Sequence, residues 1–316
     1  MAIFKDYLEN KSPLILHGAL GTEMESLGYD ISGKLWSAKY LLEKPEVIQK
    51  IHETYVAAGS DLITTSSYQA TLPGLIDSGL TKEESEQIIA STVQLAKNAR
   101  DKVWTVLDEA EKANRPYPLI SGDVGPYAAY LANGSEYTGD YGQITIEALK
   151  EFHRPRIQIL LDHGVDLLAL ETIPNYLEAQ ALIELLAEEF PEAEAYISFT
   201  VQEPGTISDG TSLDEIAQLV GQSDQILALG INCSSPLLYN QALAILKNAG
   251  KALITYPNSG EVYDGSTQTW KPKDKDALTL VEHSKDWHTQ FGVKILGGCC
   301  RTRPNDIKAL YAEFRT

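Results

Sequence analysis

The sequence predicts a single (β/α)8 barrel of the TIM type that spans residues 1–316. Eight short apolar runs recur along the whole chain, and stretches with helical spacing separate them. Most runs are hydrophobic throughout, which is typical of parallel strands buried on both faces. Strands that alternate with helices form a parallel sheet, and eight such units favour a closed barrel over an open sheet.

The runs that we expect to form strands lie at residues 14–16, 61–65, 118–121, 166–170, 195–199, 226–229, 252–256 and 293–296. Between them, apolar residues three or four positions apart predict helices at 45–58, 82–110, 145–163, 176–189, 213–219, 239–248 and 278–291. The long helix at 82–110 could be interrupted. Asn175 and Ser212 stand where N-cap residues are expected.

Composition and charge narrow the range of partners. The net charge of −18 argues against nucleic acid or an anionic membrane, because both demand a basic surface. We expect no signal peptide and no transmembrane segment, since neither a basic start followed by an apolar run nor a long apolar stretch is present. A cytoplasmic location follows as the expectation, and cysteines there more often bind metal or take part in catalysis than form disulfides.

All three cysteines fall at the ends of two predicted strands, in Gly230-Ile231-Asn232-Cys233 and in Gly297-Gly298-Cys299-Cys300. The carboxyl ends of barrel strands share one rim, so the barrel predicts that the three thiols meet. Three thiolates leave one position of a tetrahedral zinc ion open for water or substrate. The pattern therefore indicates an open, catalytic metal site.

Simpler interpretations of these cysteines exist. A buried cysteine is often only a small hydrophobic residue, and Cys233 alone would fit that interpretation. The pair Cys299-Cys300 fits it less well, because neighbouring side chains of an extended strand point to opposite faces. A structural zinc site is disfavoured, since the usual Cys-x2-Cys pairs are absent.

Other polar residues also follow predicted strands. Glu171 could cap the next helix, or its carboxylate could receive a substrate ammonium group. Asn232 and Asn258 could be turn residues or could bind a carboxylate. The basic stretch at residues 153–156 is expected to lie on a helix surface or at a subunit contact.

Together, several segments resemble the homocysteine S-methyltransferases over essentially the whole chain. Gly-Ile-Asn-Cys at 230–233 is followed much later by Gly-Gly-Cys-Cys-Arg-Thr at 297–302. Further segments of the same pattern lie at residues 35–38, 66–70, 125–127, 134–137, 152–156, 208–211 and 256–261. The set is most similar to the branch that uses S-methylmethionine, and often S-adenosylmethionine, as methyl donor.

The resemblance implies one Zn²⁺ held by Cys233, Cys299 and Cys300. It also matches Glu171 to the acidic residue that contacts the homocysteine amine. Substrate-binding roles are assigned on the same ground to further residues near these positions, namely Asn232, Tyr256, Asn258, Ser67, Tyr68 and His17. His17 is a departure, because relatives usually have an aspartate before this glycine.

The implied enzyme transfers a methyl group from a sulfonium donor to the zinc-bound thiolate of homocysteine, a step of methionine biosynthesis. Rings of Trp36, Tyr68 or Tyr127 could hold the sulfonium by cation–π attraction, or could simply pack at the rim. Two alternatives keep the fold. One is a betaine or cobalamin-bound methyl donor, and the other is a non-catalytic protein that binds zinc and a thiol amino acid.

Overall fold

The structure is a computed structural model that describes residues 3–31, 36–264, 269–271 and 277–315. Leu35 and the side chain of Trp36, which belong to one of the family segments, lie outside the described part. Among the described residues, no helix combines the length and the apolar composition needed to cross a membrane.

Eight parallel strands form one sheet in the order β1-β10-β7-β6-β5-β4-β3-β2. A bridge between Leu16 and Leu62 joins the two outer strands, so the sheet closes into a barrel. The predicted fold class is therefore confirmed, and each expected strand is present. The strands are β1 (Leu14–Ile15), β2 (Leu62–Thr64), β3 (Leu119–Val124), β4 (Leu167–Ile173), β5 (Ala195–Phe199), β6 (Ile226–Asn232), β7 (Ala252–Tyr256) and β10 (Ile295–Leu296).

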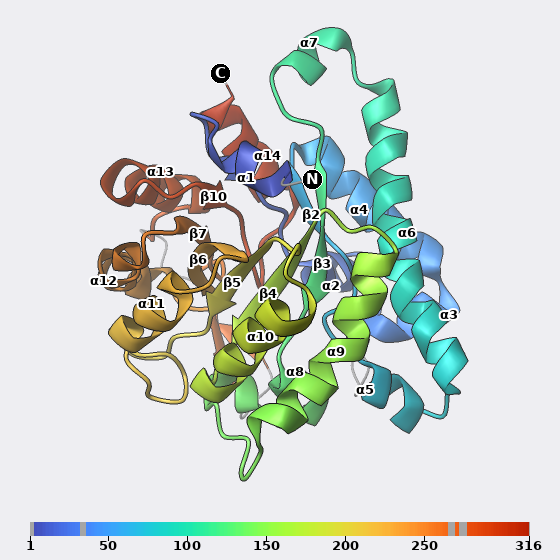
Figure 1. Cartoon of the computed structure of the whole chain (residues 1–316). Helices are drawn as coiled ribbons and strands as arrows, with labels where there is room; N and C mark the ends of the chain where they lie inside the picture. Colours follow the sequence, from blue (N-terminus) through green and yellow to red (C-terminus); the bar gives the residue numbers. More distant parts are fainter. Residues whose placement is uncertain (1–2, 32–35, 265–268, 272–276, 316) are drawn as a thin grey trace.

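Helices surround the barrel, as Figure 1 shows. Asn175 and Ser212 cap α10 and α11 as expected, and the long predicted helix breaks between α6 and α7. A short antiparallel hairpin of β8 (Val262–Asp264) and β9 (Thr269–Lys271) follows β7. The helices are α1 (Ile3–Leu8), α2 (Leu20–Ser26), α3 (Lys39–Glu43), α4 (Pro45–Ala58), α5 (Leu72–Asp77), α6 (Lys82–Val106), α7 (Glu109–Ala113), α8 (Tyr127–Leu131), α9 (Ile146–Asp162), α10 (Tyr176–Glu189), α11 (Leu213–Gly221), α12 (Tyr239–Leu246), α13 (Leu280–Phe291) and α14 (Pro304–Phe314).

The barrel interior is apolar at its amino end and polar at its carboxyl end. Phe4 of α1 is fully buried and packs in one cluster with Leu14, Leu62, Leu119 and Leu167, which come from the starts of their strands. This packing closes the lower mouth of the barrel. Chemistry is consequently confined to the opposite rim, where the strands end.

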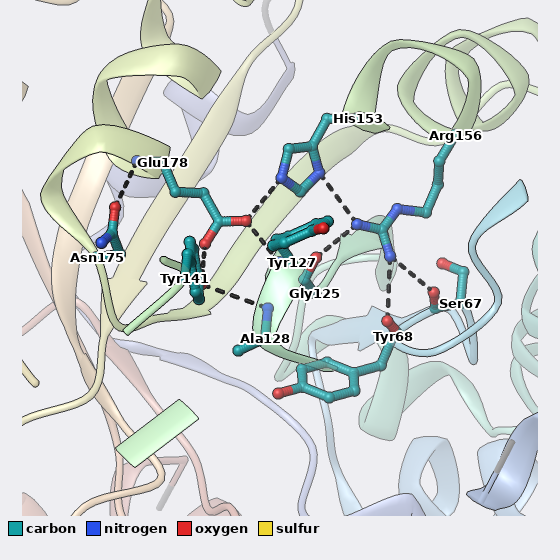
Figure 2. A network of polar contacts seen from close by, with 10 residues as sticks. All are labelled: Ser67, Tyr68, Gly125, Tyr127, Ala128, Tyr141, His153, Arg156, Asn175 and Glu178. Atoms are coloured by element: carbon teal, nitrogen blue, oxygen red, sulfur yellow. Dashed lines mark hydrogen bonds and ion pairs between the residues drawn. The ribbon is translucent and has the colours of Figure 1, made fainter. Parts of the chain in front are cut away.

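A buried polar network supports that rim from outside the barrel (Figure 2). Arg156 of α9 donates to the carbonyls of Ser67, Tyr68 and Gly125, which lie in the loops after β2 and β3. Its guanidinium also donates to Nδ1 of His153, at 3.2 Å. Arg156 therefore fastens two loops of the rim to one helix.

The same network continues to α10 through His153. Nε2 of His153 lies 2.8 Å from Oε1 of Glu178, and the Glu178 carboxylate also accepts from the Tyr127 amide and the Tyr141 hydroxyl. Arg156, His153 and Glu178 are at most 1% exposed. The expectation that residues 153–156 form an exposed surface is thus wrong for His153 and Arg156. It holds better for Arg154, which pairs with Glu189 and Glu151 at the surface.

Replacing Arg156 with leucine should lower the free energy of unfolding by at least about 3 kcal/mol, because three loop carbonyls and Nδ1 of His153 lose their buried donor, and each polar group left unsatisfied costs about 1–3 kcal/mol. The matched control is Arg154→Leu, which removes only surface ion pairs of the same helix and should cost less than about 1 kcal/mol. Denaturant-induced unfolding measures both. Equal costs for the two variants would contradict the structural role of the network.

The buried ring of His52, in α4, should make the folded protein less stable in acid. Burial, and secondarily His17, lower the pKa of His52 to about 3, so the native protein keeps this ring neutral while the unfolded chain protonates it near pH 6.5. The unfolded state then binds more protons, and the free energy of unfolding should fall by up to about 1.4 kcal/mol for each pH unit below about 6. His52→Leu should flatten this dependence in unfolding curves recorded between pH 7 and pH 4. An unchanged slope would rule the residue out as its source.

Candidate metal centre and substrate pocket

The three cysteines meet at the carboxyl rim of the barrel. Cys233 follows β6, while Cys299 and Cys300 follow β10. Their sulfur atoms all lie within 4.8 Å of one another, and Sγ of Cys233 is 3.5 Å from Sγ of Cys300. The structure thus brings together residues that the sequence separates widely.

Strand β7 lies between β6 and β10 and holds both cysteine segments in place. The Cys233 amide donates to the Tyr256 carbonyl at 3.2 Å, and the Cys299 amide donates to the Pro257 carbonyl at 2.7 Å. Cys233 has a left-handed backbone, with φ of +50°, which is uncommon for a residue with a side chain. Such strain is found where the surrounding structure fixes a functional geometry.

The two glycines before the cysteine pair allow the chain to turn closely against its neighbours. A Cβ atom on Gly297 would lie 2.7 Å from Cβ of Leu16, and one on Gly298 would overlap the side chain of Thr302. Thr302 in turn donates its hydroxyl to the Cys299 carbonyl at 2.6 Å. Any larger residue at these two positions would therefore move the thiols.

The donor set fits a soft metal ion. Thiolate sulfur is the ligand that zinc and similar ions prefer, and a trio of this kind leaves a tetrahedral ion one open position. Hydrogen bonds from Cys233 and Cys299 lower the pKa of the Cys300 thiol. The reciprocal bonds to Cys233 and Cys300, together with burial, raise the pKa of Cys299. Metal ligation requires thiolates, so a bound cation would displace the protons that these thiols share.

Glu171 stands at the end of β4, facing the barrel mouth. Its Oε2 accepts from the Tyr256 hydroxyl at 3.1 Å, and Tyr256 is further bonded to Ser198. Burial raises the pKa of Glu171 to about 7. Asn175, not Glu171, caps the following helix, so the carboxylate remains available in the pocket.

Three of the predicted substrate residues use their polar groups within the protein. Ser67 donates to the Asp123 carbonyl at 2.8 Å, and Asn232 exchanges two hydrogen bonds with Thr172. Asn258 donates to the Cys233 carbonyl at 3.1 Å, which leaves its Oδ1 without a partner among the described residues. These contacts favour supporting roles for Ser67 and Asn232.

Tyr68 and His17 lie at the same rim. The Tyr68 hydroxyl bonds the Thr172 side chain, and Arg156 holds the Tyr68 carbonyl at 3.0 Å. Burial lowers the pKa of His17 to about 4, so the ring is neutral at physiological pH. Its Nδ1 bonds the Gly18 carbonyl, and its Nε2 has no partner among the described residues.

The aromatic residues divide into two groups. Tyr127 packs edge-on against Phe152 and Tyr141, with ring centroids 5.0 Å and 5.4 Å away, which favours the rim-packing interpretation. The phenol of Tyr137, a residue that sequence reasoning did not single out, is instead influenced by the charges of the thiols. The charge on Cys233, then burial and the charges on Cys300 and Cys299, raise the pKa of the Tyr137 phenol. Only its place in the segment at 134–137 could have suggested it.

Comparisons with known proteins agree with this geometry. The family described as homocysteine S-methyltransferase matches residues 14–314. Homocysteine S-methyltransferase YbgG of Bacillus subtilis is 44% identical over 96% of this chain and 95% of its own length. Homocysteine S-methyltransferase of Escherichia coli is 43% identical over 97% of this chain and 96% of its own length.

A solved structure shares the fold as well. The metallated form of the homocysteine methyltransferase MmuM from Escherichia coli superimposes with a TM-score of 0.84 and 41% identity, covering 97% of this chain and 98% of that one. Its name states that it carries a metal, as the cysteine trio found here would require. The chain belongs to the homocysteine S-methyltransferase family.

Proposed function

We propose that this protein is an enzyme that methylates the thiol of homocysteine, and that the metal it uses is zinc. The observation that carries the proposal is the trio of cysteine sulfurs within 4.8 Å of one another, beside a carboxylate at the barrel mouth. Thiolate ligands favour zinc among the common divalent ions of proteins, and an incomplete set is typical of catalytic sites.

Cys233, Cys299 and Cys300 would hold the ion. Bound there, zinc would supply an open position at which the homocysteine thiol, whose ordinary pKa is about 8.5, loses its proton at neutral pH. Three thiolate charges outweigh the two positive charges of the ion, so the residues around the site present a net negative centre. A positively charged donor would be drawn toward this centre.

The donor that we propose carries a sulfonium group, as S-methylmethionine and S-adenosylmethionine both do. The homocysteine sulfur provides the electron pair of the new sulfur–carbon bond. The old bond between the methyl carbon and the donor sulfur breaks, and its electron pair stays on the donor as a neutral thioether. No protein side chain has to take a proton from the carbon.

The remaining task of the protein is to align the two substrates and keep water out. We assign the homocysteine ammonium group to Glu171, whose orientation the Tyr256 hydroxyl fixes. We assign contact with the donor methyl group to the ring of Tyr137, on whose phenol the charges of the thiols act. Holding reactants in line in this way can account for much of a rate enhancement.

Cys299→Ala should abolish stable zinc binding and methyl transfer together. The loss of metal affinity should exceed the about 10–100-fold typical of residues that only support a ligand. Zinc content by elemental analysis and methionine formation are measured on the same sample, with circular dichroism to confirm folding. A folded variant that keeps both zinc and full activity would refute the ligand assignment.

Glu171→Gln should raise KM for homocysteine by about 10–100-fold while zinc stays bound, because a charge-assisted hydrogen bond contributes about 1.5–3 kcal/mol. In the wild type, kcat/KM for homocysteine should increase with pH through about 7, where the Glu171 carboxyl loses its proton. Steady-state kinetics measure both effects. The control is Glu184→Gln, at a partly exposed ion pair of α10, which should leave KM unchanged.

A further inference from the structure

Asp123 of β3 lies beside Glu171 inside the barrel mouth. Asp123 is paired in register with Ala169 of β4, and Glu171 follows Ala169 by two positions. Side chains two positions apart on a strand point to the same face, and Ala169 belongs to the cluster that fills the barrel interior. The carboxyl groups of Asp123 and Glu171 therefore face the same interior space from adjacent strands.

The backbone of Asp123 is fixed on both sides. Its amide donates to Oγ1 of Thr65 at 2.9 Å, and its carbonyl accepts from Oγ of Ser67 at 2.8 Å. Thr65 and Ser67 are bonded to each other at 2.8 Å. The segment after β2 thus fixes the backbone of Asp123, and no ligand is needed for this.

The Asp123 carboxyl group shares a hydrogen bond with the Glu171 carboxyl group, but one of its buried oxygens has no partner in the described part of the chain. The residue is 4% exposed, and its Oδ1 has no hydrogen-bond partner among the described residues. The guanidinium of Arg156 acts on Asp123 only through its charge, because both terminal nitrogens are bonded to loop carbonyls and His153 and no hydrogen bond joins the two side chains. A buried polar atom without a partner costs about 1–3 kcal/mol, so such an atom calls for a binding partner or another explanation.

The neighbouring groups favour a cation as that partner. Burial, and after it the charge of Glu171, raise the pKa of Asp123, since two close carboxyl groups resist ionising together. An ammonium group bound beside the pair would take over the role of the proton that the two carboxyl groups share, and would give each carboxylate a charge-assisted hydrogen bond. His17, at the end of β1, is neutral and offers no negative charge to such a group.

We propose that Asp123 is a second carboxylate of the substrate-ammonium subsite and accepts a hydrogen bond from the amino group of homocysteine beside Glu171. This inference rests on the proposed function, because homocysteine supplies the ammonium group. Asp123 binds substrate in this account and has no part in holding the metal. Recognition of the amino acid therefore comes from β3 and β4 together.

The test compares homocysteine with 4-mercaptobutanoate, which is homocysteine without its amino group. Both are titrated calorimetrically into zinc-loaded wild type and Asp123→Asn. The variant should bind homocysteine at least tenfold more weakly and 4-mercaptobutanoate within twofold of wild type. Steady-state kinetics should show a raised KM for homocysteine and an unchanged KM for the donor.

The asparagine variant also separates binding from mere positioning. An asparagine amide can still donate to Glu171, so a residue that only orients Glu171 would leave the affinity for homocysteine within twofold, which would overturn the proposal. Asp123→Ser must weaken homocysteine binding in the same way, and it serves if the asparagine variant does not fold. The control Asp162→Asn, at the exposed end of α9, should change neither affinity.

Failure of the proposed function gives a different result. A zinc-loaded wild type that binds no homocysteine would overturn both the function and this inference. A wild type that binds homocysteine while Asp123→Asn binds it equally well would overturn the inference alone.

Discussion

The site depends on the way in which β7 holds the strands on either side of it. The carbonyls of its last residue, Tyr256, and of the next residue, Pro257, accept the amides of Cys233 and Cys299, which belong to segments far apart in the sequence. Barrel closure alone would bring β6 and β10 to the same rim. The two hydrogen bonds from β7 set the thiols at the separation that one metal ion requires, and the strained backbone at Cys233 completes the arrangement.

Charge is distributed in the pocket according to what it must bind. As metal-bound thiolates the cysteines would form a negative centre, and the carboxyl groups of Glu171 and Asp123 lie on adjacent strands. His17 stays neutral. Two arginines lie near the site: Arg301, next to Cys300, is paired with Glu261, and Arg156 uses its terminal nitrogens to anchor the loops after β2 and β3. In the function proposed above, this excess of acidic groups would favour a cationic methyl donor and a substrate ammonium group.

Much of this architecture was predictable because its signals are local. Each strand is a continuous apolar run, as burial on both faces demands, and the cysteines stand at strand ends, which a parallel barrel must bring to one rim. The resemblance to the family then predicted a substrate-binding role for Glu171, which stays a prediction. Asn175 was recognised as a helix cap from its position alone, and its capping contact leaves Glu171 free for the pocket.

What could not be predicted depends on partners distant in sequence. The sequence around His153 and Arg156 predicts a basic helix surface. Both side chains are nevertheless buried, because Arg156 bonds carbonyls of two loops and His153 bonds Glu178. The substrate-binding roles predicted for Ser67 and Asn232 stay predictions, but sequence could not show that Ser67 bonds Asp123 and that Asn232 bonds Thr172. Asp123 itself is indistinguishable from a loop residue until the register of β3 against β4 is known.

Zinc K-edge X-ray absorption with and without homocysteine tests the central claim most directly. We predict three sulfur ligands and one lighter ligand that change to four sulfurs when homocysteine binds, whereas a coordination shell unaltered by homocysteine would contradict the account.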